Sequence, residues 1–562
     1  MKTFKKIIAL FLILSGLFGC SLEEQIYDTP MSESLLKSQA DVPFLLNGVY
    51  SFLSSGNMFK ANAMFLYLNG ADDIVGSSTT ATAFSQKVYT SSTANITAAW
   101  ETYYQLINNS NKLREAMEPV NMDEAYKKRI NGELYFLRGW MYFDLVRFFG
   151  GVPIRTEGSN GAGTTFNIPR NSVEEVYALV FDDLKKASVQ CVPFSKLPAA
   201  ESGHATKGAA QGMLALAHLT YGNYFDLKGD NAKARENYAL AKSWADSVIL
   251  SGEYGLINNY ADLWDIEKEN AAYREVILGV RFSRDPLTAG AASRGSEYAG
   301  NSMPATLFGV TGDPANGIGT AKFKVQPWFY DQCATGDFAG DYRTEVSFLT
   351  KWVQNGVAGK YRIAYPSVRA SAASGETTEQ IPYLFKYRDG KGLDGRNHEN
   401  DLFYMRLAEI YLIKAEAENE LNGPTEEAYA AFNKLRARAR MANGTARLMP
   451  KDLSAGLSKE QFRMKIFDER GLELVGEGHR WFDLVRMKSS TGNRTMMEYI
   501  LDDYIKTVPS GIPVYNTATN TWQGGKTVAT SLPPWNVKYL LYPVSANELN
   551  SNPAFGQQNP GW

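Results

Sequence analysis

The sequence predicts a mainly α-helical protein built from stacked helical hairpins. Two observations predict this class. Apolar side chains recur every three or four residues over most of the chain, and alanines alternate with aromatic residues in two helix–turn–helix segments. The composition is that of a folded protein, because 44% of the 562 residues are hydrophobic and 21% are charged. Aromatic residues are the outlying class at 12%. They can fill a large helical core or form flat apolar surfaces.

The first twenty residues are typical of an export signal. Lysines occupy the start, and the apolar run over 7–18 is too short to span a bilayer. Small residues then lead to Cys20, in the pattern of a bacterial lipobox. We expect 1–19 to be a signal peptide and Cys20 to carry lipid. An ordinary signal peptide followed by an incidental cysteine is the alternative. No other stretch reaches about 18 consecutive apolar residues.

Helical periodicity covers three long stretches, at about 38–55, 94–281 and 401–490. Within the second stretch, Pro119 separates a helix over 94–118 from one over 121–149. Capping-box spacing predicts two further helix starts, with Ser172 before Glu175 and Ser458 before Gln461. The first helix begins at Ser38 and Asp41 and continues through Val49-Tyr50.

Two segments have the spacing of a helical hairpin. The first turns at 229–231 and the second at 422–424. The recurring positions are Leu214, Ala217, Tyr221, Tyr224, Ala234, Tyr238, Ala241, Ala245 and Val248 in the first, and Ala408, Tyr411, Ala415, Ala428, Phe432, Leu435 and Ala439 in the second. Small residues beside rings let paired helices approach closely, as in tetratricopeptide repeats of about 34 residues. One pair cannot cover its own apolar face, so several must stack. An irregular helical bundle is the alternative.

A short motif occurs twice. Residues 142–147 return in nearly the same order at 481–486, and each copy ends with Asp-Leu-Val-Arg. Aspartate and arginine three apart on a helix can form an ion pair. We therefore interpret both copies as structural and not as catalytic.

Four regions lack clear helical periodicity, at about 70–93, 150–170, 282–400 and 505–562. They are rich in small and polar residues, yet they carry Trp328, Trp352, Trp522 and Trp535. Loops of this length are usually functional or disordered, and their aromatic content argues against disorder.

Composition also excludes several functions. Lys and Arg total 58 against 60 Asp and Glu, so no positive field is present to hold nucleic acid. Three cysteines cannot form a disulfide scaffold. Of these, Cys191 and Cys333 could pair or remain buried thiols. The four histidines lack metal-ligand spacing, and nucleotide-binding or serine-hydrolase motifs are missing. We expect no cofactor. A glycine-rich acidic stretch from Asp389 to Asp394 lacks EF-hand spacing, so structural calcium there is unsupported.

A glycoside hydrolase is the enzymatic alternative. Glu469, Glu473 and Glu477 follow one another at four-residue steps, which puts their Cβ atoms about 5–6 Å apart on one helical face. Retaining glycosidases need roughly 5.5 Å between two carboxyl groups. Neighbours on one helix stand side by side and cannot flank a sugar from opposite faces. Arg470 and Arg480 are available to neutralise them. We therefore predict a structural role and no catalysis.

The sequence resembles the SusD/RagB family of outer-membrane nutrient-binding lipoproteins. The most specific stretch is 468–486, which includes Glu477-Gly478-His479-Arg480-Trp481. The lipobox and the segments 401–417, 542–545 and 552–561 also match. The resemblance implies a single domain over 20–562, with a tetratricopeptide-like scaffold, loop-rich insertions at about 70–93 and 282–400, and a C-terminal loop-rich segment at 505–562.

The resemblance also implies a function. Such proteins bind oligosaccharides or polysaccharides, or in some members peptides, at the outer face of the outer membrane. They deliver the ligand to a SusC-like TonB-dependent transporter without catalysis. The resemblance does not identify the ligand.

Sugar rings present C–H faces that aromatic rings cover and hydroxyls that polar side chains satisfy, and several aromatic contacts are needed to offset the entropy cost of association. Two loops could supply them. The candidate ligand-binding residues are Asp72, Asp73, Phe84, Tyr89 and Trp100 in the first, and Tyr298, Trp328, Tyr330 and Trp352 in the second. The alternative is that Trp100 begins a core helix and that Trp328 holds its loop against the scaffold.

Overall fold

The computed structural model describes residues 36–159, 167–283, 295–303, 320, 322–353, 361–363, 365, 381–389, 397–508, 514–516, 521–523 and 532–562. Within these ranges, no helix is both long enough and apolar enough to span a bilayer. The signal peptide and Cys20 lie outside the described residues, as does most of the stretch from Asp389 to Asp394.

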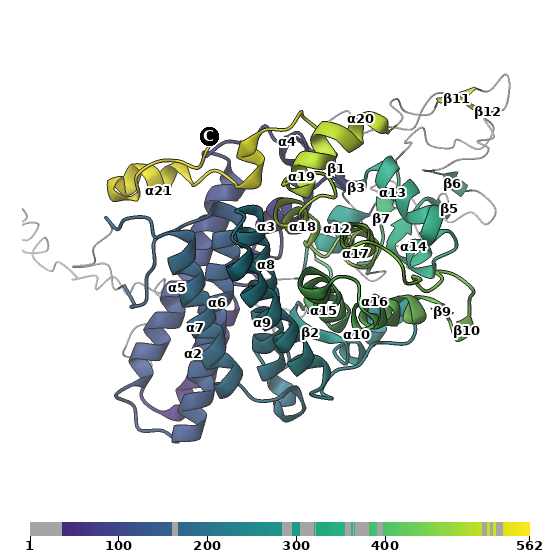
Figure 1. The fold of residues 1–562 in the computed structure, drawn as a ribbon. Coiled ribbons are helices and arrows are strands. Elements are labelled where there is room, and N and C mark those ends of the chain that lie inside the picture. Colours follow the sequence, from purple (N-terminus) through teal and green to yellow (C-terminus); the bar gives the residue numbers. More distant parts are fainter. Residues whose placement is uncertain are drawn as a thin grey trace, which may run out of the picture.

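The structure is mainly helical, as predicted (Figure 1). Its longer helices are α2 (Val42–Tyr50), α5 (Ala94–Met117), α6 (Glu124–Phe149), α7 (Val173–Gln190), α8 (Lys207–Leu227), α9 (Asn231–Ile249), α15 (Leu407–Asn422), α16 (Glu426–Ala439) and α17 (Lys459–Glu473). The shorter ones are α3 (Asn62–Met64), α4 (Thr79–Ser85), α10 (Glu269–Ala272), α12 (Tyr298–Ser302), α13 (Pro327–Ala334), α14 (Tyr342–Ser347), α18 (Arg480–Arg486), α19 (Met496–Tyr499), α20 (Ile505–Thr507) and α21 (Ala546–Ser551).

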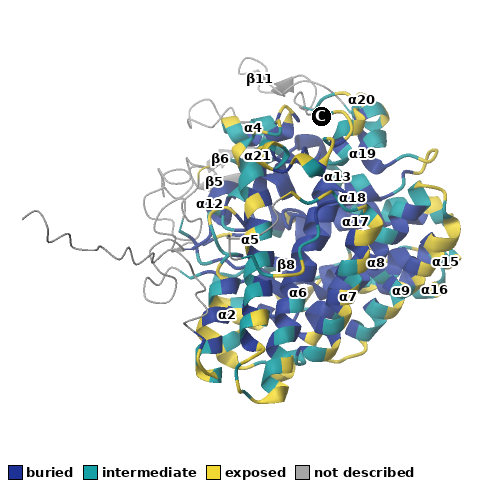
Figure 2. Ribbon diagram, turned by 90° about the vertical axis from the view of Figure 1, so that its left-hand side faces the viewer, coloured by how far each residue is buried: buried dark blue, intermediate teal, exposed yellow. Residues whose placement is uncertain are grey.

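Consecutive long helices pack against one another in a stack. α5 packs on α6, α6 on α7, α7 on α8 and α8 on α9; α9 then contacts α15, which pairs with α16. Both predicted hairpins are present, as α8–α9 and α15–α16. Gly222 shows why small residues matter here, because a Cβ atom at that position would lie 2.7 Å from the Tyr238 ring. Buried residues fill the inside of the stack and exposed ones mark its outer faces (Figure 2).

The helix starts agree with the capping signals. The hydroxyl oxygens of Ser172 and Ser458 each accept a hydrogen bond from the backbone N–H three residues on. In return, the backbone N–H of each serine donates to the side chain of Glu175 or Gln461. Ser38 caps a short turn that continues into α2. These reciprocal bonds satisfy backbone donors that a helix start leaves open.

A small sheet accompanies the scaffold. Strands β1 (Ile74–Gly76), β3 (Phe323–Val325), β7 (Tyr383–Leu384) and β4 (Phe348–Leu349) pair in that order, each antiparallel to its neighbour. The remaining strands form antiparallel pairs: β2 (Val276–Val280) with β8 (Leu402–Arg406), β5 (Lys351–Val353) with β6 (Tyr361–Ile363), β9 (Met441–Ala442) with β10 (Thr445–Ala446), and β11 (Val514–Asn516) with β12 (Thr521–Gln523). The predicted loop regions thus contribute this sheet, together with α4, α12, α13, α14 and α21.

The C-terminal segment returns across the first long helices (Figure 1). Trp562 stacks on Tyr89 with ring centroids 5.1 Å apart. Asn559 Nδ2 donates to the carbonyl of Phe149 at 3.0 Å, and Tyr542 donates its hydroxyl to the carbonyl of Leu66 at 2.8 Å. Residues from the two ends of the described chain therefore share one core.

The repeated motif is structural, as predicted. Asp483 accepts from Arg486 at 2.7 Å, and Asp144 pairs with Arg147 in the other copy. All four side chains are buried. Cys191 and Cys333 are free and buried.

Candidate functional site

A cavity of about 560 Å³ opens where the loop-rich half meets the helical scaffold. Its walls come from α13, α17 and the short turns η9 (Gly336–Phe338) and η11 (Ile500–Tyr504). The lining residues are Trp328, Asp331, Gln332, Thr335, Gly336, Asp337, Phe338, Arg436, Lys465, Asp468, Tyr504, Thr507 and Val508. We call this cavity the α13–α17 pocket.

Aromatic rings form the apolar part of the α13–α17 pocket. Trp328 stands at the start of α13, which Pro327 initiates. Its ring meets Tyr504 edge to face, with centroids 5.6 Å apart. Trp328 is only 3% exposed, whereas Tyr504 is half-buried. The more accessible of these two rings is therefore Tyr504.

Polar groups line the same cavity beside these rings. Gln332 on α13 donates through Nε2 to Asp468 Oδ1 on α17 at 2.7 Å. Burial raises the pKa of Asp468 to about 6. Tyr365 donates its hydroxyl to Asp331 Oδ2 at 2.7 Å. Amide and carboxylate groups held in this way can exchange hydrogen bonds with a hydroxyl-rich ligand.

Two cations also line the α13–α17 pocket, and each is held by a carboxylate. Lys465 Nζ lies 2.6 Å from Asp337 Oδ2, and this hydrogen bond lowers the pKa of Asp337. Arg436 Nε lies 3.0 Å from Glu469 Oε2. The Arg436 guanidinium also faces the Phe338 ring, 5.5 Å from its centroid.

Asp72 and Asp73 lie buried beneath this region and do not line the cavity. Arg480 binds Asp72 through two bonds of 2.7 and 2.9 Å, while its guanidinium lies 3.9 Å from the Phe467 ring centroid. Burial, and next the charge of Asp72, raises the pKa of Asp73 to about 7. The prediction that these two aspartates contact ligand is therefore corrected. Both are internal, and the Asp72–Arg480 pair joins the chain after η3 (Phe65–Asn69) to α18.

Four predicted aromatic residues also belong to the core. Phe84 stacks on Tyr89 at 5.0 Å, and both are almost fully buried. Trp100 packs on Phe149 and donates Nε1 to Glu548 at 3.3 Å, so it is a core residue of α5, as the alternative held. Tyr298 is buried and donates its hydroxyl to the Gly476 carbonyl. The prediction that these four rings stack on a ligand is therefore corrected: other side chains cover the rings, which pack inside the core.

Two predicted residues remain near the cavity. Trp328 lines it, although its burial also agrees with the alternative that it holds α13 against the scaffold. Tyr330 is half-buried and meets Tyr365 edge to face at 5.5 Å. The side chain of Trp352 lies outside the described residues.

The sequence reasoning missed Gln332, Asp468 and Tyr504. They come from positions far apart in the chain: Gln332 falls in a predicted loop, Asp468 in the predicted scaffold, and Tyr504 between the scaffold and the C-terminal segment. Asp468 begins the stretch 468–486 that resembles the family, with the sequence Asp-Glu-Arg at its start. Its first carboxylate faces the pocket, whereas Glu469 and Arg470 point into buried ion pairs.

The glutamates of the hydrolase alternative lie in a buried ion network. The Glu473 carboxylate forms ion pairs with Arg343, whose Nη1 lies 2.9 Å from Oε2, and with Arg406, whose Nη1 lies 3.0 Å from Oε1. Although burial opposes it, these guanidiniums and that of Arg438 keep the pKa of Glu473 well below its usual range. Glu477 lies past the end of α17 and pairs with Lys386. The neutralising partners differ from those expected: Arg470 pairs with Asp483, and Arg480 pairs with Asp72.

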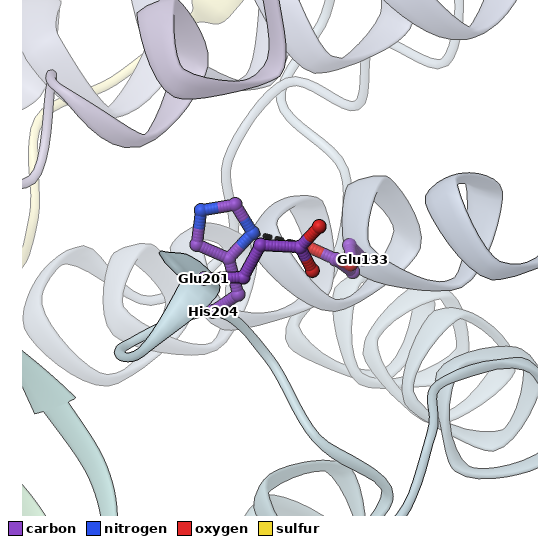
Figure 3. A group of neighbouring side chains, drawn as sticks. All are labelled: Glu133, Glu201 and His204. Atoms are coloured by element: carbon purple, nitrogen blue, oxygen red, sulfur yellow. Dashed lines mark hydrogen bonds and ion pairs between the residues drawn. The ribbon is translucent and has the colours of Figure 1, made fainter. Parts of the chain in front are cut away.

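A second cluster combines Glu133, Glu201 and His204 (Figure 3). His204 Nδ1 lies 3.0 Å from Glu133 Oε2. Arg129 contacts both carboxylates, 3.1 Å from Glu133 Oε1 and closer to Glu201. A guanidinium therefore already supplies the positive charge that a metal ion would bring. The cluster ties the turn η5 (Ala199–Glu201) to α6.

A stack of helical hairpins that carries a pocket of rings and hydrogen-bonding groups is suited to binding a ligand. Comparison with known families specifies which kind of protein this is. The chain belongs to the SusD family, whose model matches residues 274–562. A second family model, described as "Starch-binding associating with outer membrane", matches residues 22–219. This is a family of binding proteins that associates with the outer membrane.

Individual relatives agree with this assignment. "SusD-like protein P2" of Formosa agariphila is 28% identical over 506 residues, which covers 87% of this chain and 91% of the relative. A solved SusD homolog from Bacteroides thetaiotaomicron is similar with a TM-score of 0.75 at 22% identity, covering 94% of this chain and 98% of the other. A structure titled "Laminarin binding SusD-like protein" has a TM-score of 0.65 at 23% identity and covers 94% of this chain and all of its own. The structural matches establish the fold.

Proposed function

We propose that this protein binds oligosaccharide or polysaccharide in the α13–α17 pocket and does not cleave it. The observation that carries the proposal is the composition of that cavity, in which Trp328 and Tyr504 adjoin the hydrogen-bonded pair Gln332–Asp468. Aromatic rings cover the C–H faces of sugars, while amide and carboxylate groups bind their hydroxyls. A relative of the same fold is described as binding laminarin, a glucan, which supports this class of ligand.

The site is consistent with capture rather than tight sequestration. Few of its rings are exposed, and each aromatic contact adds on the order of 1 kcal/mol beyond the area that it buries. Association also has to overcome the entropy lost by a flexible polymer. An affinity in the micromolar to millimolar range is therefore expected.

A direct test separates the competing functions. The purified protein is run in native gels that contain neutral polysaccharides, and the same mixtures are assayed for new reducing ends. Retarded migration without new reducing ends is the expected result. Reducing ends would instead indicate a glycoside hydrolase. Binding to peptides alone would indicate the peptide-binding alternative.

We further propose that the protein is lipid-anchored through Cys20, faces the cell exterior and delivers its ligand to a SusC-like TonB-dependent transporter. The lipobox sequence and the family's association with the outer membrane support this proposal. An affinity tag on this protein should co-purify a TonB-dependent transporter from detergent-solubilised outer membranes. Recovery of the protein without any such transporter would contradict the delivery step.

A further inference from the structure

The charges of the α13–α17 pocket limit which sugars it can accept. Three carboxylates line it, from Asp331, Asp337 and Asp468, against two cations, from Lys465 and Arg436. Among the described lining residues, negative groups therefore outnumber positive ones. An anionic ligand is therefore repelled by more charged groups of the lining than attract it.

Each lining cation is already paired with a carboxylate. Lys465 is held at the rim by Asp337 at 2.6 Å. Arg436 is engaged by Glu469 at 3.0 Å and donates Nη1 to the Lys451 carbonyl at 2.9 Å. Arg436 is only 2% exposed, so a ligand in the pocket cannot reach its guanidinium without a rearrangement of the wall.

A carboxylate or sulfate group on a sugar would lose hydration here and would have to compete with Asp337 or Glu469 for a cation. Such desolvation is costly unless an opposite charge and hydrogen bonds replace the water. Resting on the proposed function, we propose that this pocket selects uncharged sugars and discriminates against uronic acids and sulfated glycans. We assign the selectivity to these two ion pairs, one at the rim and one buried, because they engage both cations that an anionic sugar would need.

The pair Gln332–Asp468 is suited to uncharged hydroxyls. One Nε2 hydrogen of Gln332 is used on Asp468 Oδ1. The second Nε2 hydrogen and the Gln332 carbonyl oxygen can then donate and accept side by side, and Asp468 Oδ2 adds an acceptor. Neighbouring sugar hydroxyls each offer one donor and two acceptor lone pairs, which match this array.

The experiment compares polymers that differ in charge alone. Laminarin, pullulan, galactomannan and arabinoxylan are tested by affinity electrophoresis and calorimetry, each also as a carboxymethyl derivative and as an uncharged hydroxyethyl derivative of equal substitution. Polygalacturonate and alginate are included. Measurements at low and physiological salt separate local repulsion from long-range effects. We expect carboxymethylation to weaken binding at least tenfold and hydroxyethylation to weaken it by less than threefold.

The outcomes distinguish this inference from the proposed function. Equal affinity for neutral and carboxymethyl forms, or binding to polygalacturonate or alginate alone, would overturn the selectivity while leaving glycan binding intact. Failure to bind any polysaccharide would overturn the proposed function, and the selectivity with it.

A matched pair of variants tests the assigned cause. Asp337→Asn releases Lys465 into the pocket and should raise affinity for the carboxymethyl polymer severalfold relative to the neutral one. Asp182→Asn is the control, because Asp182 holds Lys186 on α7 at the same 2.6 Å with similar exposure but lies outside the pocket. It should leave the ratio unchanged. An unchanged ratio in Asp337→Asn, or an equal shift in both variants, would overturn the role of the rim ion pair.

Discussion

Two tryptophans with similar sequence surroundings occupy different environments. Trp100 and Trp328 both stand near the start of a helix that follows a loop. Trp100 packs against Phe149 in the core, whereas Trp328 forms a wall of the α13–α17 pocket. Both rings are almost fully buried, and they differ in what covers them: residues of the C-terminal segment, such as Glu548, close over Trp100, whereas Tyr504 packs on Trp328.

Tyr504, the more exposed ring of the pocket, and Trp100 in the core predict opposite effects of substitution. Tyr504→Ala should lower affinity for a bound neutral glycan about tenfold with little change in melting temperature, because Tyr504 is half-buried at the pocket. Trp100→Ala should destabilise the fold by about 3–5 kcal/mol, since it leaves a cavity in the core. Calorimetry and thermal unfolding of both variants check this. A Trp100 variant that keeps its melting temperature and loses affinity would restore Trp100 as a ligand contact.

Asp468 predicts a pH-dependent stability. Burial raises its pKa from 3.8 to about 6, so the folded state keeps a proton that the unfolded state releases. The stabilisation from this proton is complete below about pH 4 and is lost as pH rises through 6. Asp468→Asn should therefore be more stable than the parent at pH 8, on the order of 1 kcal/mol because the carboxyl faces the pocket, and equal to it at pH 4.

Thermal unfolding at both pH values measures this difference. Asp182→Asn, at an exposed position on α7, is the control and should show no such dependence. A difference for Asp468→Asn that is the same at pH 4 and pH 8 would show that the gain comes from another source.

Sequence reasoning recovered part of the candidate site. It singled out Trp328 and Tyr330 in the second loop, and both lie at or near the cavity. It assigned Phe84 and Tyr89 to a surface arc, although C-terminal residues such as Trp562 cover them. Loop residues have no period that tells which side faces solvent, so burial by a distant segment leaves no local signal.

A buried ion network joins several elements. Arg406, at the end of β8, contacts Glu275 before β2 at 2.7 Å and Glu473 at the end of α17 at 3.0 Å. It also binds Glu477 through two bonds of 2.7 Å. Arg406 is fully buried, so these contacts fix how the strand pair sits against the helices.

Removing this central cation should be far more harmful than removing a surface one. Arg406→Met removes the one cation that contacts all of Glu275, Glu473 and Glu477. Arg343, Lys386 and Arg438 then remain to balance three buried carboxylates, and the loss should cost about 3–5 kcal/mol of unfolding free energy. Arg447→Met is the matched control, because Arg447 pairs with Glu345 at the surface, where an ion pair contributes about 0–1 kcal/mol. Urea denaturation measures both. Equal losses would show that the buried network does not depend on Arg406.

The scaffold elements were largely predictable, and the reason lies in their spacing. Alanine and aromatic positions three and four apart identified α8, α9, α15 and α16, and capping signals located the starts of α7 and α17. The small sheet was not predicted. Its strands are two or three residues long, and their partners lie from a few dozen residues away, as for Phe348 and Leu384, to about 250 residues away, as for Ile74 and Val325. Alternation over so few positions is too short to detect.

At the scale of the whole molecule, anchoring can be tested without the ligand. Cys20→Ala removes the residue that is predicted to carry the lipid. The protein should then move from the membrane fraction to the soluble fraction, because durable attachment needs more than one acyl chain. Fractionation of cells that produce the parent and the variant checks this. Persistence of Cys20→Ala in the membrane fraction would contradict lipidation at this cysteine.

The return of the C-terminal segment has a consequence for biogenesis. Synthesis proceeds from the amino end, so α5 and α6 emerge well before Asn559, which bonds to Phe149, and Trp562, which stacks on Tyr89. Until those last residues arrive, apolar surface on the earliest helices has no cover. The early helices therefore depend for their cover on residues that are synthesised about 400 codons later, and their apolar surface must be kept from aggregating until then.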